Sequence, residues 1–179
     1  MRPGHHPRLL PPLILAAILL LTLSRPALAS TYVSWDRFEA DKLAAAWLIK
    51  RFVDPDAVFR FLPAGSPLPE GVPFDVPQAE LRRTVRQTTF AAILARHALK
   101  DPVLARLATF ISDLEINLWG EKQYRESVEI QDFVLSQIDV ADHAVLIDNT
   151  LAFFDILYDR LGAAPSGTGE RRRNPAGKD

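Results

Sequence analysis

Two carboxylates stand out because the sequence places them among apolar residues. Asp41 and Lys42 come directly before the wholly apolar run 43–49, and Glu115 lies between Ile111 and Leu118 on one helical stripe. A buried carboxylate has to be neutralised, paired with a cation or bound to a metal ion. Both residues are therefore candidates for a polar site, with a structural ion pair as the competing interpretation.

The basic residues that could pair with these acids are Lys42, Arg51 and Arg106. Asp113 is an i, i+4 partner of Asn117 on another side of the helix that carries Glu115, whereas Asp155 is interpreted as part of a solvated acidic face. The predicted binding residues are Asp41, Lys42, Trp47, Arg51, Asp113 and Glu115.

A second candidate is the basic cluster Arg82, Arg83 and Arg86, which comes just before a helix expected to start at Thr89. Arginine side chains beside a helix N-terminus suit an anion. A solvated basic face is the alternative. The sequence contains no nucleophile elbow, phosphate loop, dinucleotide fingerprint or H-E-x-x-H motif, so we assign no catalytic residue and leave any metal and cofactor unknown.

The first residues carry a different signal. Arg2 and Arg8 precede an apolar run of about 15 residues and the small-x-small sequence A-L-A ending at Ala29, the pattern of a secretory signal peptide. We expect residues 1–29 to be removed and the protein to be exported to the periplasm. A retained membrane anchor is the alternative. The remaining chain has a formal charge of −4, which disfavours a nucleic-acid partner.

The elements that must position these residues form one domain over residues 30–161. Residues 31–35 and 57–62 are predicted strands, and 74–77 is a possible third strand. Helices are expected at 37–53 with an Asp36–Glu39 capping box, at 89–99 with Thr88 or Thr89 as the cap, and at 102–119 with Asp101 as the cap. Two more are expected at 124–138, with Leu135 and Ile138 facing inward, and from the Asp139 cap to 161. The fold class is α+β, predominantly helical, with about five helices and a small sheet. Residues 162–179 are expected to form a disordered basic tail.

Five segments together resemble a known family, the C-terminal domain of ChrB-type chromate resistance proteins. They are D-K-L-A-A-A-W-L-I-K-R-F-V-D-P-D-A from Asp41, G-V-P-F-D-V-P-Q-A-E-L from Gly71, D-P-V-L-A-R-L from Asp101, D-L-E-I-N-L-W from Asp113 and F-D-I-L-Y from Phe154. Exported members made of a signal peptide and this domain are the most similar. Two positions depart from the family pattern, since many relatives have a histidine at Ser112 and another near Val85 and Arg86.

The resemblance implies a role in chromate resistance or sensing. Our leading hypothesis is a non-enzymatic domain that binds chromate, another small ion or a partner. The alternative is an enzyme that uses Asp41, Asp113 and Glu115 to hold Mg²⁺, Mn²⁺ or Ca²⁺, or as acid and base groups. We also predict that the core helix packs on the 102–119 helix so that Asp41, Lys42 and Glu115 meet, with Lys42 or Arg51 offsetting the two acids.

Overall fold

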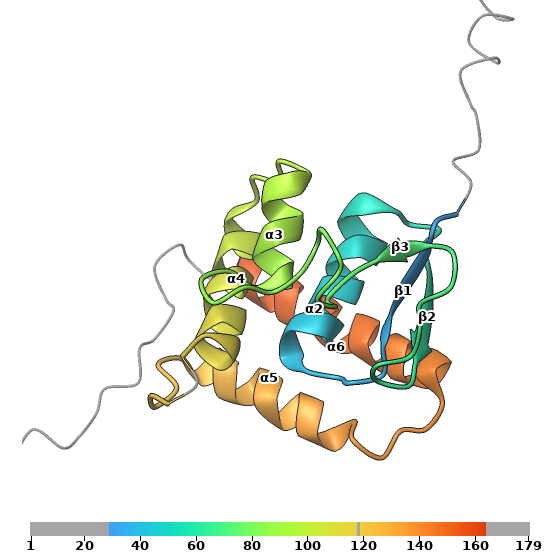
Figure 1. The fold of residues 1–179 in the computed structure, drawn as a ribbon. Helices are drawn as coiled ribbons and strands as arrows, with labels where there is room; N and C mark the ends of the chain where they lie inside the picture. Colours follow the sequence, from blue (N-terminus) through green and yellow to red (C-terminus); the bar gives the residue numbers. More distant parts are fainter. Residues whose placement is uncertain (1–28, 118, 164–179) are drawn as a thin grey trace, which may run out of the picture.

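The computed structural model describes residues 29–117 and 119–163, so the predicted signal segment up to residue 28 and the predicted tail from residue 164 lie outside the described residues. Figure 1 shows a small sheet on one side of the molecule and most of the helices on the other, with helix α2 (Ala40–Leu48) between them. The predicted class is confirmed: within the described residues, five α-helices accompany three short strands.

The sheet is built on the first strand. β1 (Thr31–Trp35) lies in the middle and pairs in parallel with β2 (Val58–Leu62) and with the two-residue strand β3 (Val72–Pro73). The first two strands match the prediction. The third starts earlier than predicted and ends before Asp75, whose φ of 48° takes the backbone out of the extended conformation.

Gly71 leads the chain into β3 through a conformation that other residues rarely adopt. Its φ is 151°, and an added Cβ would lie 2.6 Å from the Thr31 carbonyl oxygen and 2.9 Å from Val33 Cγ1. We expect Gly71→Ala to lower the free energy of unfolding by about 2 kcal/mol, because strain and a backbone clash add. Gly65→Ala is the matched control in urea unfolding, since Gly65 also has a positive φ but open space around it. Equal losses in the two variants would contradict the clash.

The core helix is shorter than predicted but fully enclosed. α2 (Ala40–Leu48) buries every one of its residues and continues as the π-helical turn η1 (Ile49–Val53). The predicted Asp36–Glu39 capping box is wrong. The Asp36 carboxylate instead accepts from the Ala64 amide, and Glu39, which precedes the first helical residue, caps nothing with its side chain. Because Asp36 is tied to the end of β2, the helix begins only at Ala40.

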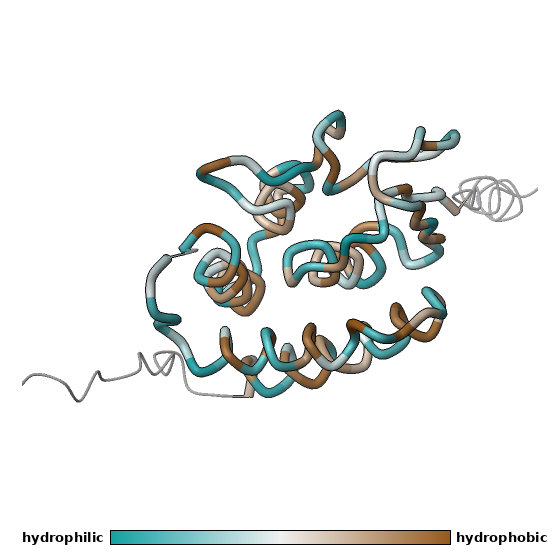
Figure 2. Tube along the Cα trace, turned by 60° about the horizontal axis from the view of Figure 1, so that its bottom comes forward, coloured by the Kyte–Doolittle hydropathy of each residue, from teal (hydrophilic) through white to brown (hydrophobic). Residues whose placement is uncertain are grey.

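Four helices cover α2, which contacts each of them. They are α3 (Thr89–Arg96), α4 (Pro102–Glu115), α5 (Arg125–Ser136) and α6 (His143–Ala163). Along these helices hydrophobic positions alternate with hydrophilic ones in the tube view (Figure 2). Contact of α2 with α4 was predicted. No helix within the described ranges is both long and apolar enough to cross a bilayer.

The caps of these helices follow the sequence in part. Thr88 and Asp101 cap α3 and α4 as predicted. α4 ends at Glu115 rather than Trp119, because Lys122 Nζ binds the carbonyl oxygens of Asp113, Leu114 and Asn117 and so closes the helix.

Three further helix predictions are wrong. α6 starts at His143, capped by Asp142 rather than Asp139, and it runs on through Ala163, two residues into the predicted tail. Leu135 and Ile138 were expected to face inward but are more than half exposed, because α5 ends at Ser136 and buries Ser127 and Ile130 instead.

Candidate functional site: a charged cluster at the start of the core helix

Charged side chains gather where the N-terminal end of α2 meets the loop before α3 and the last turn of α4. Asp41 and Lys42 are almost wholly buried there, and the side chains of Glu115 and Asp75 are each 10% exposed. The Asp41 amide donates to Glu115 Oε1 over 3.3 Å. The predicted meeting of Asp41 and Glu115 is therefore confirmed, whereas the side chain of Lys42 turns to Trp35 and Asp75.

Asp41 accepts hydrogen bonds from the first backbone amides of α3, the helix that follows the loop of Arg82, Arg83 and Arg86. Its two carboxylate oxygens accept from the Thr89 amide at 2.6 Å and from the Phe90 amide at 2.8 Å, at the start of α3. Burial raises the pKa of Asp41 to about 7, because the loss of water outweighs these two hydrogen bonds, which favour the carboxylate. The N-terminus of α3, where an anion was predicted, is thus already occupied by a side chain of the protein.

Glu115 is held by an arginine that was not its predicted partner. Arg83 donates from Nη1 to Glu115 and from Nη2 to Glu39 Oε2 at 2.6 Å, so it ties α4 to the start of α2. The prediction that Lys42 or Arg51 offsets Glu115 is wrong. Burial raises the pKa of Glu115 even beside Arg83.

Lys42 has two other partners. Its Nζ donates to the Trp35 carbonyl oxygen at 2.6 Å and lies 3.7 Å from Asp75 Oδ2. Burial lowers the pKa of Lys42 and raises the pKa of Asp75, because water is removed from both charges. Asp75 also accepts from the Thr89 hydroxyl at 2.6 Å, so a single chain of contacts joins β1, α2, the loop after β3 and α3.

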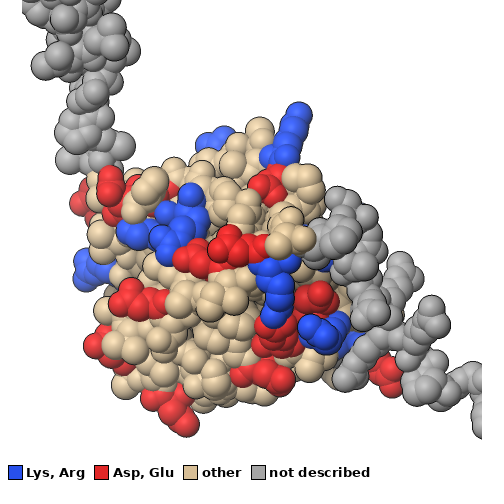
Figure 3. Space-filling view, turned by 180° about the vertical axis from the view of Figure 1, so that it is seen from behind, with Lys and Arg blue, Asp and Glu red and all other residues tan. Residues whose placement is uncertain are grey.

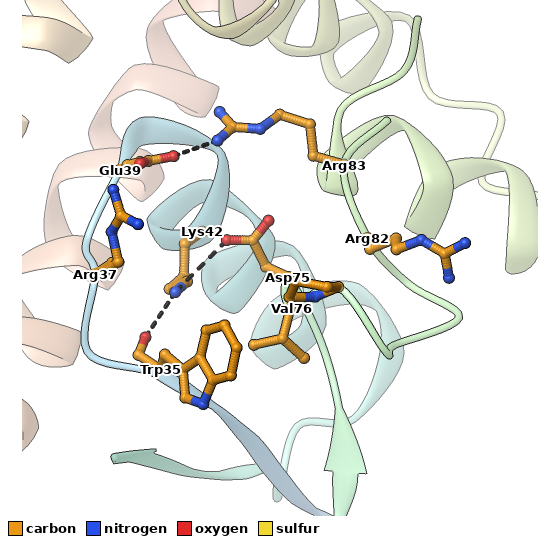
Figure 4. Close-up of a pocket in the computed structure, with 9 residues that line it drawn as sticks. Trp35, Arg37, Glu39, Lys42, Asp75, Val76, Arg82 and Arg83 are labelled. Atoms are coloured by element: carbon orange, nitrogen blue, oxygen red, sulfur yellow. Dashed lines mark hydrogen bonds and ion pairs between the residues drawn. The ribbon is translucent and has the colours of Figure 1, made fainter. Parts of the chain in front are cut away.

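A pocket of about 450 Å³ opens over this cluster (Figure 4). Its lining is charged and apolar: Trp35, Arg37, Glu39, Lys42, Asp75, Val76, Pro77, Arg82 and Arg83. Arg86 does not line it, so the predicted arginine triplet divides, with Arg82 and Arg83 at the pocket and Arg86 exposed elsewhere on the loop. Arg37 and Arg82 form no ion pair with any described residue.

The remaining predicted site residues lie apart from the pocket lining. Trp47 is buried beside Phe154 and Tyr158, and it donates from Nε1 to Asp155 Oδ1 at 2.8 Å. Arg51 binds the same carboxylate, so Asp155, which was expected to be a solvated acid, is a paired one. These contacts stabilise the packing of α2 and η1 against α6.

The contacts of Asp113 also stabilise the fold and lie outside the pocket. It is buried, accepts from Asn117 as the i, i+4 spacing predicts, and accepts from the Gln123 amide at 2.8 Å, which closes the turn after α4. Among the described residues, no three His, Cys, Asp or Glu side chains are arranged to hold one metal ion. The geometry therefore gives no support to a shared metal centre of Asp41, Asp113 and Glu115.

Six pocket residues were missed from the sequence, among them Val76 and Pro77, which were assigned only to the possible third strand. Glu39 was interpreted as a helix cap, and Trp35 and Arg37 as part of a strand and a helix start. Asp75 had a visible signal, since a lone acid lies between Phe74 and Val76 in a segment bounded by prolines, as Asp41 lies beside an apolar run. The same argument from buried charge would have selected it.

Fold and site together define a helix-rich α+β domain with a buried charged cluster beneath a polar pocket. The chain belongs to the family of the ChrB C-terminal domain, whose sequence profile matches residues 32–161. It is 36% identical over 78 residues to Protein ChrB of Cupriavidus metallidurans, an alignment that covers 42% of this chain and 24% of that relative. The matched part is thus about a quarter of the relative's length. No solved structure matches the chain significantly.

Proposed function

We propose that this domain contributes to chromate resistance or response by binding a small oxyanion in the pocket beside Lys42. Family membership supports the chromate role. The observation that carries the binding site is the charge of the pocket lining, which contains four cationic side chains and two acids. Counting Glu115, which binds Arg83 from outside the lining, still leaves one positive charge in excess.

Arg37 is the residue that this proposal depends on most. Arg83 is held by two carboxylates and Lys42 by Asp75, whereas Arg37 lines the pocket without an ion-pair partner among the described residues. A divalent anion would supply the missing partner, and a charge-assisted arginine contact of this kind contributes about 1.5–3 kcal/mol. Elsewhere, on the face seen from behind, acidic and basic side chains are interleaved (Figure 3).

Calorimetric titration of chromate into the purified protein, with sulfate as competitor, tests this proposal. We expect heat of binding in the wild type and a loss of affinity of about tenfold or more in Arg37→Gln, equivalent to about 1.4 kcal/mol. Arg86→Gln is the control, because Arg86, like Arg37, is an exposed arginine but lies outside the pocket. The absence of heat at millimolar chromate would refute the proposal, as would equal losses in the two variants.

We also propose that residues 1–29 direct export and that the domain acts in the periplasm. The support is the sequence pattern of a basic start, an apolar run and A-L-A at Ala29. Cell fractionation with N-terminal sequencing tests this. A periplasmic protein that starts at Ser30 is the expected result, and an uncleaved chain in the cytoplasm would contradict it.

A further inference from the structure

The pocket is larger than a tetrahedral oxyanion needs. Such an ion carries four water-sized oxygen atoms and displaces on the order of 100 Å³, from the roughly 30 Å³ that one water molecule occupies in the liquid. The pocket measures about 450 Å³, within the range of sites that hold organic small molecules. An oxyanion alone would leave most of this volume to water.

Part of the pocket lining is apolar and therefore offers no hydrogen-bond partners to water. Trp35 and Val76 lie next to each other at one end, and Arg37, Glu39 and Arg83 lie at the other, with Lys42 and Asp75 between them (Figure 4). Pro77 adds a further apolar wall. Water molecules confined against such walls have few polar partners, so an apolar ligand group that displaces them is favoured.

The apolar end is also held in place before any ligand arrives. Trp35 Nε1 donates to the Ser66 carbonyl oxygen at 2.9 Å, and the Trp35 carbonyl oxygen accepts from Lys42. Val76 is only 3% exposed. A wall fixed by hydrogen bonds and packing loses little freedom when a flat group packs on it.

We infer that this pocket binds an organic anion whose flat apolar part packs against Trp35 and Val76 while its acidic group meets Arg37. The inference rests on the location of the proposed anion site and names a different ligand class. Arg37 is the counter-charge because Arg83 and Lys42 are engaged by carboxylates. Arg82 points away from Lys42 in Figure 4, and its Nη1 donates to the Ala79 carbonyl oxygen.

Phenyl phosphate and inorganic phosphate provide the test, because they share the anionic group and differ by one aromatic ring. Calorimetric titration of each into the full protein is expected to give at least tenfold tighter binding of phenyl phosphate. In Arg37→Gln the affinity for both ligands should fall. In Trp35→Leu only the ratio of the affinity for phenyl phosphate to that for inorganic phosphate should change, falling towards one. Trp119→Leu is the control, since Trp119 is 99% exposed and lies outside the pocket.

The outcomes separate this inference from the proposed function. Chromate binding without a preference for phenyl phosphate would overturn the inference and leave the oxyanion role. A preference for phenyl phosphate in a protein that gives no heat with chromate would support the inference and remove the oxyanion role. If Trp35→Leu fails to fold, the wild-type protein alone decides. A ratio near one between its affinities for phenyl phosphate and inorganic phosphate overturns the inference.

Discussion

Replacing Lys42 with methionine is expected to lower the free energy of unfolding by about 3–5 kcal/mol, because removal of one partner leaves a buried charge unpaired. The side chains of Lys42 and Asp75 are 3% and 10% exposed, so water solvates the remaining carboxylate poorly. The Trp35 carbonyl oxygen would also lose its 2.6 Å donor. Urea unfolding measures the loss, and Lys100→Met, at an exposed position, should change little.

A double-mutant cycle shows whether the loss comes from the ion pair. In Lys42→Met combined with Asp75→Asn no unpaired charge remains, and asparagine still offers an oxygen to the Thr89 hydroxyl and tolerates a φ of 48°. The double variant is therefore expected to be clearly more stable than the sum of the two single losses predicts. Simple additivity would show that the two charges are not coupled.

Removing the Asp41 carboxylate is expected to cost about 2–4 kcal/mol. In Asp41→Ala the amides of Thr89 and Phe90 lose their acceptors in a site closed to water, and an unmet buried donor costs about 1–3 kcal/mol. Thermal or urea unfolding gives the value. Asp132→Ala, at an exposed position in α5, is the control, and an equal small effect in both variants would contradict the capping role.

The same residue makes stability depend on pH. Because burial raises the pKa of Asp41 from 3.8 to about 7, the folded protein keeps a proton that the unfolded chain loses above about pH 4. The free energy of unfolding should thus fall as the pH rises from about 4 to about 7. Asp75 and Glu115, whose pKa values burial also raises, act in the same direction.

Asp41→Asn tests this dependence, since asparagine does not titrate. Its free energy of unfolding should fall less steeply between pH 4 and 7 than that of the wild type, with the remaining slope due to the other acids. A variant with the wild-type slope would show that Asp41 does not hold the proton.

The sequence predicted the secondary structure where local chemistry decides it. The side chains of Thr88 and Asp101 accept from backbone amides only two or three residues further along the chain, so the local sequence is enough to predict these caps. Predictions failed where a distant residue intervened. Asp36 could have capped the core helix, but β2 brings the Ala64 amide to it, and Lys122 ends α4 by binding its last carbonyl groups.

The candidate site shows the same division. That Asp41 and Glu115 are buried acids followed from their apolar neighbours, and packing of α2 on α4 brought them together. Their partners could not be predicted, because Arg83 and Asp75 are on irregular segments whose path is set by the sheet and by the positive φ of Asp75. Arg51 is closer to Asp41 in the sequence than Arg83 is, but its side chain pairs with Asp155 on α6.

The most direct test of the account is a crystal structure of the protein grown with chromate, with data collected to record the anomalous signal of chromium. The account predicts a chromium peak in the pocket, within contact distance of the Arg37 guanidinium, and no such peak in crystals of Arg37→Gln. A chromium peak only at other sites, or an empty pocket at a chromate concentration that gives heat of binding, would contradict it.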